Sequence, residues 1–501
     1  MKKFAKIFSA LMALMMLFSI SATLSSCNKK EEGKETATTA GTVDTGSAEG
    51  TLEALTVKDM EGRVFRMLWP EFIAKEGHFS HNELAVAEGA TGDMIDQAVF
   101  TRTESVKLAY NADVQVEIMH YASIDDAVRQ DHAVGAETYD AVATMLKQLS
   151  TVAIEGALKD YNDLTYYNED QSWWNHDVMQ SLSIANRRYF GSGDIIYSDD
   201  LYPYVIYANT ALASAVGITD NFYQLVKNKE WTLERFHEYA AQATADIDGV
   251  AGLSVGDRFG AVDGASFSKA LYYTAGKGVI SLNKQGYPEW QMTKTHADNV
   301  LSVIIDALHV DDAVVDVVTQ LGVSKSEATA NYIMNMFNSN QMLFMPGDLK
   351  ASQAFTTMEN ALEDFALLPM PLWDSNSDYI CVMNEAVVIG IPTLAEDIDD
   401  VGLFLSAMSR ESVTTLTPAF FDTVLTYRYM KNAESVETLQ LILDSVVPRD
   451  VADVQGWGGF MEAFGKMAVE GEAEFASYYD SNYSAAMGKM DEYIDLLLAV
   501  K

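Results

Sequence analysis

The sequence predicts an α/β protein, because strand-like and helix-like segments alternate along the chain from Leu55 onward. The part that follows residue 54, about 450 residues, is long enough for one large two-lobed unit or for two to three domains. A hydrophobic content of 49% with 11% aromatic residues supports a substantial core.

The first elements follow one another closely. Apolar patterning predicts strands at Val64–Trp69, Val114–Met119 and Tyr139–Leu146, with helices at Asp93–Tyr110 and Asp125–Ala133 between them. Strands separated by helices of this length predict a largely parallel sheet with helices packed on it.

The stretch from Arg187 to Gly217 is the one around which we expect the chain to be organised. A Gly-Ser-Gly-Asp turn separates two aromatic, β-branched runs, which indicates a hairpin or a crossover. The second run, Tyr202–Tyr207, is typical of a buried strand, and Asp199 and Asp200 precede it where a polar group can face a cleft. We therefore interpret this stretch as a passage from one lobe to another whose side chains help to hold a ligand.

The later segments continue the alternation. A helix opens after Trp231, with Thr232 as N-cap and Glu234 in its first turn, and we expect a simple turn at Asp246–Gly249 because the full set of calcium ligands is missing. Strands are predicted at Gln341–Met345, Phe365–Pro371 and Ala386–Ile391, a helix at Ile398–Met408, and a helical C-terminal part from Glu411 with a break at Gly456–Gly459.

The N-terminus carries a sorting signal. Lys2, Lys3 and Lys6 precede an apolar run, Phe8–Ile20, that is too short to span a bilayer. Leu24-Ser25-Ser26-Cys27 resembles the lipobox of bacterial lipoproteins, which makes residues 1–26 a signal peptide and Cys27 the lipidated residue; an ordinary secretory peptide is the alternative. Residues 27–54 are almost free of bulky apolar residues, so we expect a flexible tether.

Charge and cysteine content restrict the partners. The formal net charge of −38 argues against nucleic acid, anionic lipid surfaces and polyanionic ligands. Cys27 and Cys381 are the only cysteines, so a lipidated Cys27 leaves no disulfide and no cysteine-based zinc site within one mature chain. Cys381 lies in an apolar run and is expected in the core.

Several longer stretches resemble the extracellular solute-binding proteins of ABC transporters, within the carbohydrate-binding family found as lipoproteins. They are the tether behind Cys27, Trp231–Gly249, Phe365–Pro392 and Pro418–Asp444, and their order covers most of the chain from Leu55. At Trp373-Asp374 the chain departs from the pattern, because many relatives carry a basic residue after the proline.

The resemblance implies a two-lobed, periplasmic-binding-protein-like fold with a hinge and an interlobe ligand cleft. The first lobe would hold residues 55–199 and 373–410, and the second 200–372 and 411–501. Pro369, Pro371 and the Gly191/Gly193 turn are candidate hinge positions. The implied partners are a saccharide and ABC transporter permease subunits; we expect a lipid-anchored monomer at the outer face of the cytoplasmic membrane, without a cofactor.

Aromatic rings are the first group of candidate site residues, because sugars present apolar C–H faces on which planar side chains stack. The candidates are Trp69, Trp173, Trp174, Tyr202, Tyr272, Tyr273, Trp373 and Trp457. Core packing is the alternative for each ring.

Carboxylates that accept hydroxyl protons form the second group. Asp199, Asp200 and Asp348 are the candidates, because each lies at a strand end or at the crossing; solvated surface charge is the alternative. We predict no metal site, although His78, His81 and Glu83 have a spacing that could bind one.

The main competing function is a secreted, lipid-anchored glycoside hydrolase that uses a carboxylate pair. The chain has no nucleophile elbow, zinc signature or phosphate loop, so we predict a binding protein without catalysis. A surface adhesion or scaffold protein would more often show repeats, and none is present.

Overall fold

The computed structural model describes residues 52–71, 83–84, 94–197, 201–262, 265–324, 330–351, 365–420 and 433–500. The chain divides into two compact units, Met1–Ala54 and Leu55–Lys501. The predicted signal peptide, Cys27 and all but the last residues of the tether lie outside the described part. Among the helices of the described part, none has the length and apolar character needed to cross a membrane.

The first sheet has the strand order β12-β3-β1-β2. The strand β1 (Arg63–Glu71) pairs in parallel with β2 (Ala112–His120) and β3 (Ala141–Met145), as predicted, whereas β12 (Val387–Gly390) joins β3 in the antiparallel sense. The connecting helices are α2 (Met94–Tyr110) and α3 (Ile124–Val134), and the further helices of this lobe are α4 (Leu146–Ile154), α5 (His176–Ser181) and α13 (Ile398–Ser412). Phe65 of β1 stacks on Phe404 of α13, with ring centroids 4.2 Å apart, which ties a late helix to the first sheet.

The second sheet has the strand order β10-β4-β9-β5-β8. Its strands are β4 (Tyr204–Asn209), β5 (Phe259–Val262), β8 (Val314–Val315), β9 (Met342–Asp348) and β10 (Phe365–Pro369), and β4 runs antiparallel to both β9 and β10. The helices of this lobe include α6 (Thr210–Ala215), α7 (Phe222–Lys227), α8 (Leu233–Ala243), α9 (Ala265–Thr274), α10 (Lys294–His309), α11 (Ala330–Asn338) and α16 (Ala433–Asp444). Thr232 caps α8 as predicted, since its side chain accepts a hydrogen bond from the Arg235 N–H at 3.2 Å.

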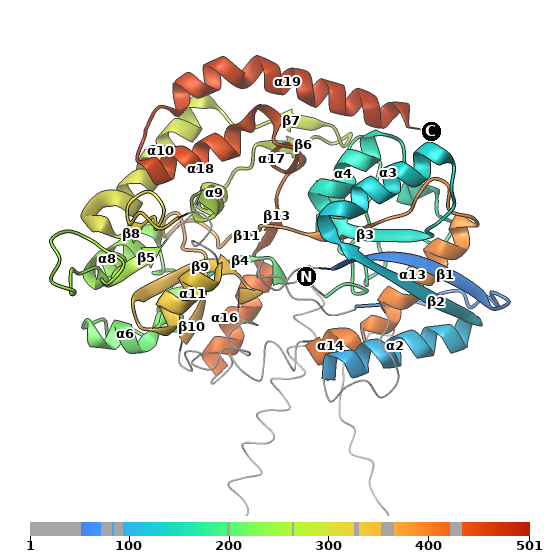
Figure 1. Cartoon of the computed structure of the whole chain (residues 1–501), viewed down its shortest axis with the longest axis horizontal. Helices are drawn as coiled ribbons and strands as arrows, with labels where there is room; N and C mark the ends of the chain where they lie inside the picture. The colour runs from blue at the N-terminus through green and yellow to red at the C-terminus, as the bar shows by residue number, and fades with distance from the viewer. Residues whose placement is uncertain are drawn as a thin grey trace, which may run out of the picture. The chain divides into compact units, whose positions relative to one another are not determined.

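Within the described ranges, three segments pass between the two sheets. Residues 201–203 lead into β4, β11 (Cys381–Met383) leads toward β12, and β13 (Val446–Pro448) leads to the C-terminal helices. β11 pairs in parallel with β13, and Pro203 forms an antiparallel bridge with Met383. These strands lie between the two sheets in Figure 1.

The crossing near Gly191 is therefore a crossover and not a hairpin. Gly191 forms a bridge with Ile389 of β12 and Gly193 forms one with Trp174, so this turn packs beside the first sheet. The strand that follows it, β4, is part of the second sheet. Among the described residues, the chain changes sheet at these crossing segments, and Pro369 ends β10. Because proline cannot donate to a ladder, it suits an edge strand such as β10.

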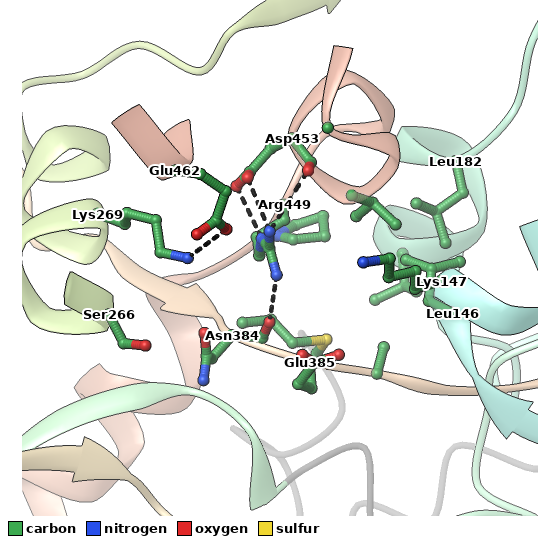
Figure 2. Close-up of a pocket in the computed structure, with 16 residues that line it drawn as sticks. Leu146, Lys147, Leu182, Ser266, Lys269, Asn384, Glu385, Arg449, Asp453 and Glu462 are labelled. Atoms are coloured by element: carbon green, nitrogen blue, oxygen red, sulfur yellow. Dashed lines mark hydrogen bonds and ion pairs between the residues drawn. The ribbon is translucent and has the colours of Figure 1, made fainter. Parts of the chain in front are cut away.

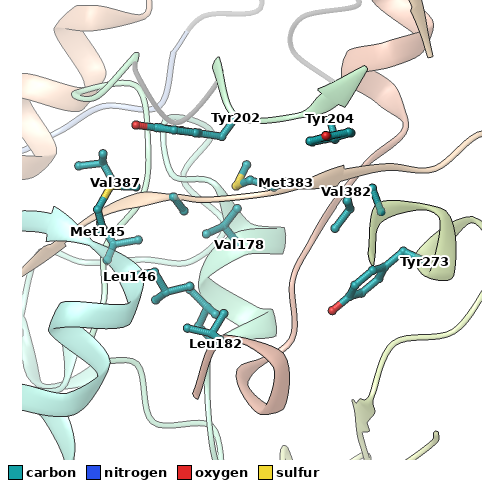
Figure 3. Packing of buried hydrophobic residues seen from close by; sticks show 14 of the residues in the cluster. Met145, Leu146, Val178, Leu182, Tyr202, Tyr204, Tyr273, Val382, Met383 and Val387 are labelled. Atoms are coloured by element: carbon teal, nitrogen blue, oxygen red, sulfur yellow. The ribbon is translucent and has the colours of Figure 1, made fainter. Parts of the chain in front are cut away.

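One buried hydrophobic cluster runs through the crossing region. Figure 3 shows Met383 of β11 with Val178 of α5, Leu146 of α4 and the rings of Tyr202 and Tyr204, and all of these side chains are buried. Cys381 is fully buried in this region, as expected for a core cysteine. The two lobes therefore share a core at the crossing.

The C-terminal helices lie across both lobes. They are α17 (Val451–Gln455), α18 (Phe460–Glu470) and α19 (Phe475–Ala499), and the predicted break at Gly456–Gly459 is present, with Gly458 and Gly459 at φ of +68° and +65°. α19 packs against α10 of the second lobe and α4 of the first, as Figure 1 shows. α14 (Leu416–Phe420), which the predicted boundaries put in the second lobe, packs against α2. The lobe boundaries themselves stay a prediction.

The lobes also meet at a second place, which we call the outer bridge: residues 184–189, the tip of the hairpin formed by β6 (Ile280–Leu282) and β7 (Pro288–Trp290), and the end of α19. The Ala185 N–H donates to the Gly286 carbonyl at 2.8 Å. Arg187 Nη1 donates to the Val500 carbonyl at 2.8 Å, and the Tyr189 hydroxyl donates to the Leu497 carbonyl at 3.2 Å.

Candidate functional site

A pocket with a volume of about 270 Å³ lies where the first lobe, the second lobe and the crossing segments meet. Figure 2 shows the charged and apolar side chains around it. Its lining includes Leu146, Lys147 and Leu182 from the first lobe, Ser266, Lys269 and Glu462 from α9 and α18, Asn384 and Glu385 after β11, and Arg449 and Asp453 around the start of α17.

The backbone of residues 384–386 is held on three sides. The Asn384 N–H donates to the Tyr202 carbonyl at 2.9 Å, and the Asn384 carbonyl accepts from Arg449 Nη1 at 3.0 Å. The Ala386 carbonyl accepts from the Leu146 N–H at 2.8 Å, which satisfies one of the first N–H groups of α4, a helix whose N-cap Met145 offers no side-chain cap. This segment is therefore a fixed floor for the pocket.

A buried ion pair forms one wall. Arg449 grips Asp453 with two parallel hydrogen bonds, Nε to Oδ2 and Nη2 to Oδ1, both at 2.7 Å. Burial acts to lower the pKa of Arg449, but the carboxylate of Asp453 outweighs it and the net shift is upward. The Tyr273 hydroxyl donates to the same carboxylate at 2.9 Å, so the charged wall is connected to α9.

Behind this wall, Asp450 caps α17 and accepts hydrogen bonds from the N–H groups of Asp453, Val279 and Ile280. Burial, with the charge of Asp453 as the second cause, raises the pKa of Asp450 to about 7. The group that fixes the start of α17 is thus a carboxylate that titrates near neutrality.

A second ion pair joins two helices of the second lobe at the pocket: Lys269 of α9 and Glu462 of α18 are 2.8 Å apart. Two other charged side chains of the lining, Lys147 and Glu385, are not paired in this way in the part of the chain that the structure describes. Among the described residues, Lys147 and Glu385 form no side-chain hydrogen bond or ion pair. Glu385 is partly buried, and burial raises the pKa of its carboxyl group, with Arg449 as the strongest opposing influence.

The aromatic candidates predicted from the sequence lie mostly in the core, and none of them lines this pocket. The rings of Trp69, Trp173, Trp174, Tyr202, Tyr272, Tyr273 and Trp457 are all buried, and Trp373 is partly buried. Trp457 packs edge-on against Tyr493 of α19, with centroids 5.4 Å apart. Ligand contacts of these rings stay predictions.

Of the three carboxylate candidates, one lies within the described residues. Asp199 and Asp200 lie outside the described residues. Asp348 is 3.3 Å from Lys350, whose ammonium lies 4.6 Å from the centre of the Tyr202 ring, so the structure brings Tyr202 and Asp348 together at the crossing. Burial raises the pKa of Asp348, while Lys350 acts against this shift.

The two sequence features weighed as metal sites lie only partly within the described residues. His78 and His81 lie outside the described residues, and Glu83 accepts a hydrogen bond from the Tyr197 N–H at 3.1 Å. Asp257 accepts from the N–H groups of Ile247 and Ser254, both at 2.7 Å, in the turn that also contains Asp246 and Asp248. In this turn, carboxylate oxygens of Asp246, Asp248 and Asp257 lie within 4.8 Å of one another, so the absence of a bound cation stays a prediction.

Sequence reasoning missed Lys147, Lys269, Glu385, Arg449 and Glu462. A signal existed for two of them. Asn384-Glu385 is a polar pair between two apolar strands, and Arg449-Asp450 follows the apolar Val446–Pro448 in the same way. The other three lie on helices, where charged residues are common and carry no such signal.

Comparison with known proteins identifies solved structures that have a similar fold. No protein-family model and no curated protein sequence matches this chain. Among solved structures, it is similar to an ABC substrate-binding protein from Listeria monocytogenes in complex with cycloalternan, at 11% identity and a TM-score of 0.53, over 86% of this chain and 99% of that one.

Two further structures match over similar shares. The galacto-N-biose/lacto-N-biose I-binding protein of an ABC transporter from Bifidobacterium longum, in complex with lacto-N-biose, shares 12% identity with a TM-score of 0.52, over 87% of this chain and 99% of that one. The maltose/maltodextrin-binding domain from Bdellovibrio bacteriovorus, bound to maltotriose, shares 11% identity with a TM-score of 0.52, over 85% of this chain and 100% of that one. The predicted two-lobed, periplasmic-binding-protein-like α/β fold is confirmed.

Proposed function

We propose that this protein is an extracytoplasmic solute receptor that binds a sugar or oligosaccharide between its two lobes and delivers it to an ABC transporter permease. The observation that carries the proposal is the pocket lined by α4, by α9 and α18, and by the crossing segments. A ligand that contacts side chains from both lobes stabilises their approach, and this couples binding to a shape that a permease can recognise.

The chemistry of the lining suits a polyhydroxylated ligand. Sugar hydroxyls both donate and accept hydrogen bonds, so they need acceptors such as Glu385 and donors such as Lys147 and Arg449 within one cavity. The solved structures named above, which have this fold, are described as sugar complexes of binding proteins. These complexes support the substrate class by analogy of fold.

A glycoside hydrolase is not favoured. Such an enzyme needs one carboxylic acid that protonates the leaving group and one free carboxylate. Of the three acids that line the pocket among the described residues, Asp453 is held by Arg449 and Glu462 by Lys269, which leaves Glu385 alone. We therefore propose binding without catalysis.

The location follows from the N-terminal residues. The proposal places the mature chain at the outer face of the cytoplasmic membrane, anchored through lipidated Cys27 and held away from the bilayer by residues 28–54. The partners would be the permease subunits and the membrane, with the receptor acting as a monomer.

The first test is a thermal-shift screen of residues 28–501 against mono- and oligosaccharides, with amino acids, polyamines and metal ions as controls. A ligand that binds only the folded state raises the melting temperature with its excess over Kd. We expect a shift with one class of saccharide and no product after prolonged incubation. A shift with a control solute alone contradicts the sugar assignment, and product formation contradicts the absence of catalysis.

A further inference from the structure

The pocket contains one acidic group whose hydrogen-bonding capacity is not used within the described residues. Its other two carboxylates are neutralised, Asp453 by Arg449 at 2.7 Å and Glu462 by Lys269 at 2.8 Å. Glu385 has no such partner, although it lies at the junction of both lobes and is partly buried. A carboxylate that loses water without gaining a partner raises the free energy of the ligand-free protein.

The neighbouring cations do not supply that partner. The charges that act on Glu385 are those of Arg449, Lys350 and Lys269, which favour the ionised form, and of Asp348, which disfavours it. Each of the three cations is bonded elsewhere: Arg449 to Asp453, Lys269 to Glu462, and Lys350 to Asp348. They reduce the cost of the charge on Glu385 but leave its oxygen atoms open.

The hydrogen bonds of the neighbouring backbone limit how far the Glu385 carboxylate can move toward bulk water. Asn384 and Ala386, the residues on either side, are tied to Tyr202, Arg449 and Leu146 by hydrogen bonds of 2.8 to 3.0 Å. These bonds restrain the backbone around Glu385, whose side chain can still rotate. The carboxylate is therefore presented to the pocket by a fixed floor.

The shape and composition of the pocket restrict what can satisfy this group. An ionised carboxylate only accepts hydrogen bonds, and its two oxygens can accept from two neighbouring hydroxyls at once. Among the described residues that line the pocket there is no aromatic ring, so these residues would recognise a ligand at its hydroxyl edge and not by stacking. A volume of about 270 Å³ lies just below the usual range of ligand pockets, which favours a small ligand of one or two sugar rings.

We propose that Glu385 is the specificity-determining acceptor of the pocket and that the ligand is a neutral mono- or disaccharide that presents two adjacent hydroxyls to it. An acidic sugar is disfavoured where its carboxylate would face Glu385. This inference rests on the proposed function, because it specifies the ligand of the same pocket.

The test is isothermal titration calorimetry of the secreted chain (residues 28–501) with the saccharide that gives the largest thermal shift and with the matching uronic acid. The variant is Glu385→Gln, which keeps size but loses charge and one acceptor. The matched control is Glu230→Gln, an exposed residue outside the pocket. Because hydrogen bonds to charged groups are the strong ones, we expect about 10- to 100-fold weaker binding by Glu385→Gln and no change in the control.

The pH profile separates a direct role from a structural one. Hydroxyl donors stabilise the ionised carboxylate, so the affinity of the wild type should fall as the pH drops through the pKa of Glu385, which burial raises above its ordinary value. The Glu385→Gln variant should lack this step. Its melting temperature without ligand should not decrease, because the substitution removes an unpaired and partly buried charge.

The outcomes distinguish the two proposals. Equal affinity and an equal pH profile in wild type and Glu385→Gln overturn the role of Glu385 but leave the sugar receptor standing. Tighter binding of the uronic acid than of the neutral sugar overturns the assigned ligand class. A wild type that binds no saccharide overturns the proposed function itself.

Discussion

The two lobes meet at the pocket and at the outer bridge, and the two places are built differently. At the outer bridge, backbone carbonyls of Gly286, Leu497 and Val500 receive hydrogen bonds from residues 185–189, so the contact is complete in itself. At the pocket, charged side chains surround a cavity, and Glu385 has no partner among the described residues. Polar groups whose hydrogen bonds are formed between the lobes hold the lobes together. A polar group without such a bond can accept one from a ligand.

This difference assigns different roles to the two regions. Changes at the outer bridge should alter stability with little effect on ligand affinity. Changes at open groups of the pocket should alter affinity with little effect on stability. The Arg449–Asp453 pair lines the pocket and is also buried, so a change there should alter both affinity and stability.

The largest loss of stability is expected from Arg449→Met. It leaves the carboxylate of Asp453, whose side chain is 2% exposed, without its cation. Breaking a buried pair in this way typically costs about 3–5 kcal/mol. Denaturant unfolding should show this loss, whereas the control Arg235→Met, in an exposed pair with Glu238, should change the unfolding free energy by less than about 1 kcal/mol. Equal small losses in both variants would mean that the buried pair is not formed.

A comparable loss is expected from Trp457→Ala, since the ring is 4% exposed and packs on Tyr493 near the outer bridge. Removing a buried tryptophan costs about 3–5 kcal/mol. Calorimetry at a temperature where the variant remains folded should then give an unchanged affinity for the sugar. Weaker binding with unchanged stability would instead support stacking of Trp457 on the ligand, as the sequence predicts.

Gly286→Ala acts directly on the outer bridge. A methyl group at Gly286 would lie 2.7 Å from the Asn186 nitrogen, and the residue has a φ of +76°. The control Gly249→Ala has nearly the same φ, +79°, but no atom within 4 Å. The control should lose about 1–2 kcal/mol from the left-handed backbone alone, and Gly286→Ala about 1–3 kcal/mol more from the clash. Equal losses in thermal unfolding would show that the bridge contributes nothing.

A pH dependence that reports on Asp450 tests the wall of the pocket. Its pKa is raised from 3.8 to about 7 in the folded protein, so folding favours the protonated form. This contribution is fully present below pH 4 and is lost as the pH rises through about 7. The unfolding free energy of the wild type should therefore fall more steeply over this range than that of Asp450→Asn. Parallel profiles would contradict the raised pKa.

The order of elements could be predicted from the sequence, and the contents of the pocket could not. Val64–Trp69 and Tyr139–Leu146 become β1 and β3 because alternating or continuous apolar patterns depend only on neighbouring residues. Thr232 and the glycines at 456–459 act through equally local geometry. The pairing of β12 with β3 joins segments more than 200 residues apart, and no local pattern predicts it.

The residues of the site were harder to predict from the sequence than the fold, for a physical reason. Tryptophan is used both for sugar stacking and for core packing, and the structure places Trp69 and Trp173 in the core with about 1% exposure. Lys147, Glu385 and Arg449 come from three separate parts of the chain and share a pocket only after the crossing segments form. Charge alone could not single them out among 72 acidic and 34 basic residues.

The most direct measurement is a crystal structure of the protein with the saccharide that gives the largest thermal shift. We predict sugar density in the pocket between the lobes, with two hydroxyl oxygens within hydrogen-bonding distance of the Glu385 carboxylate and the outer bridge unchanged. Sugar bound elsewhere, for example against Trp373 and away from Glu385, would contradict the assignment of this pocket as the ligand site.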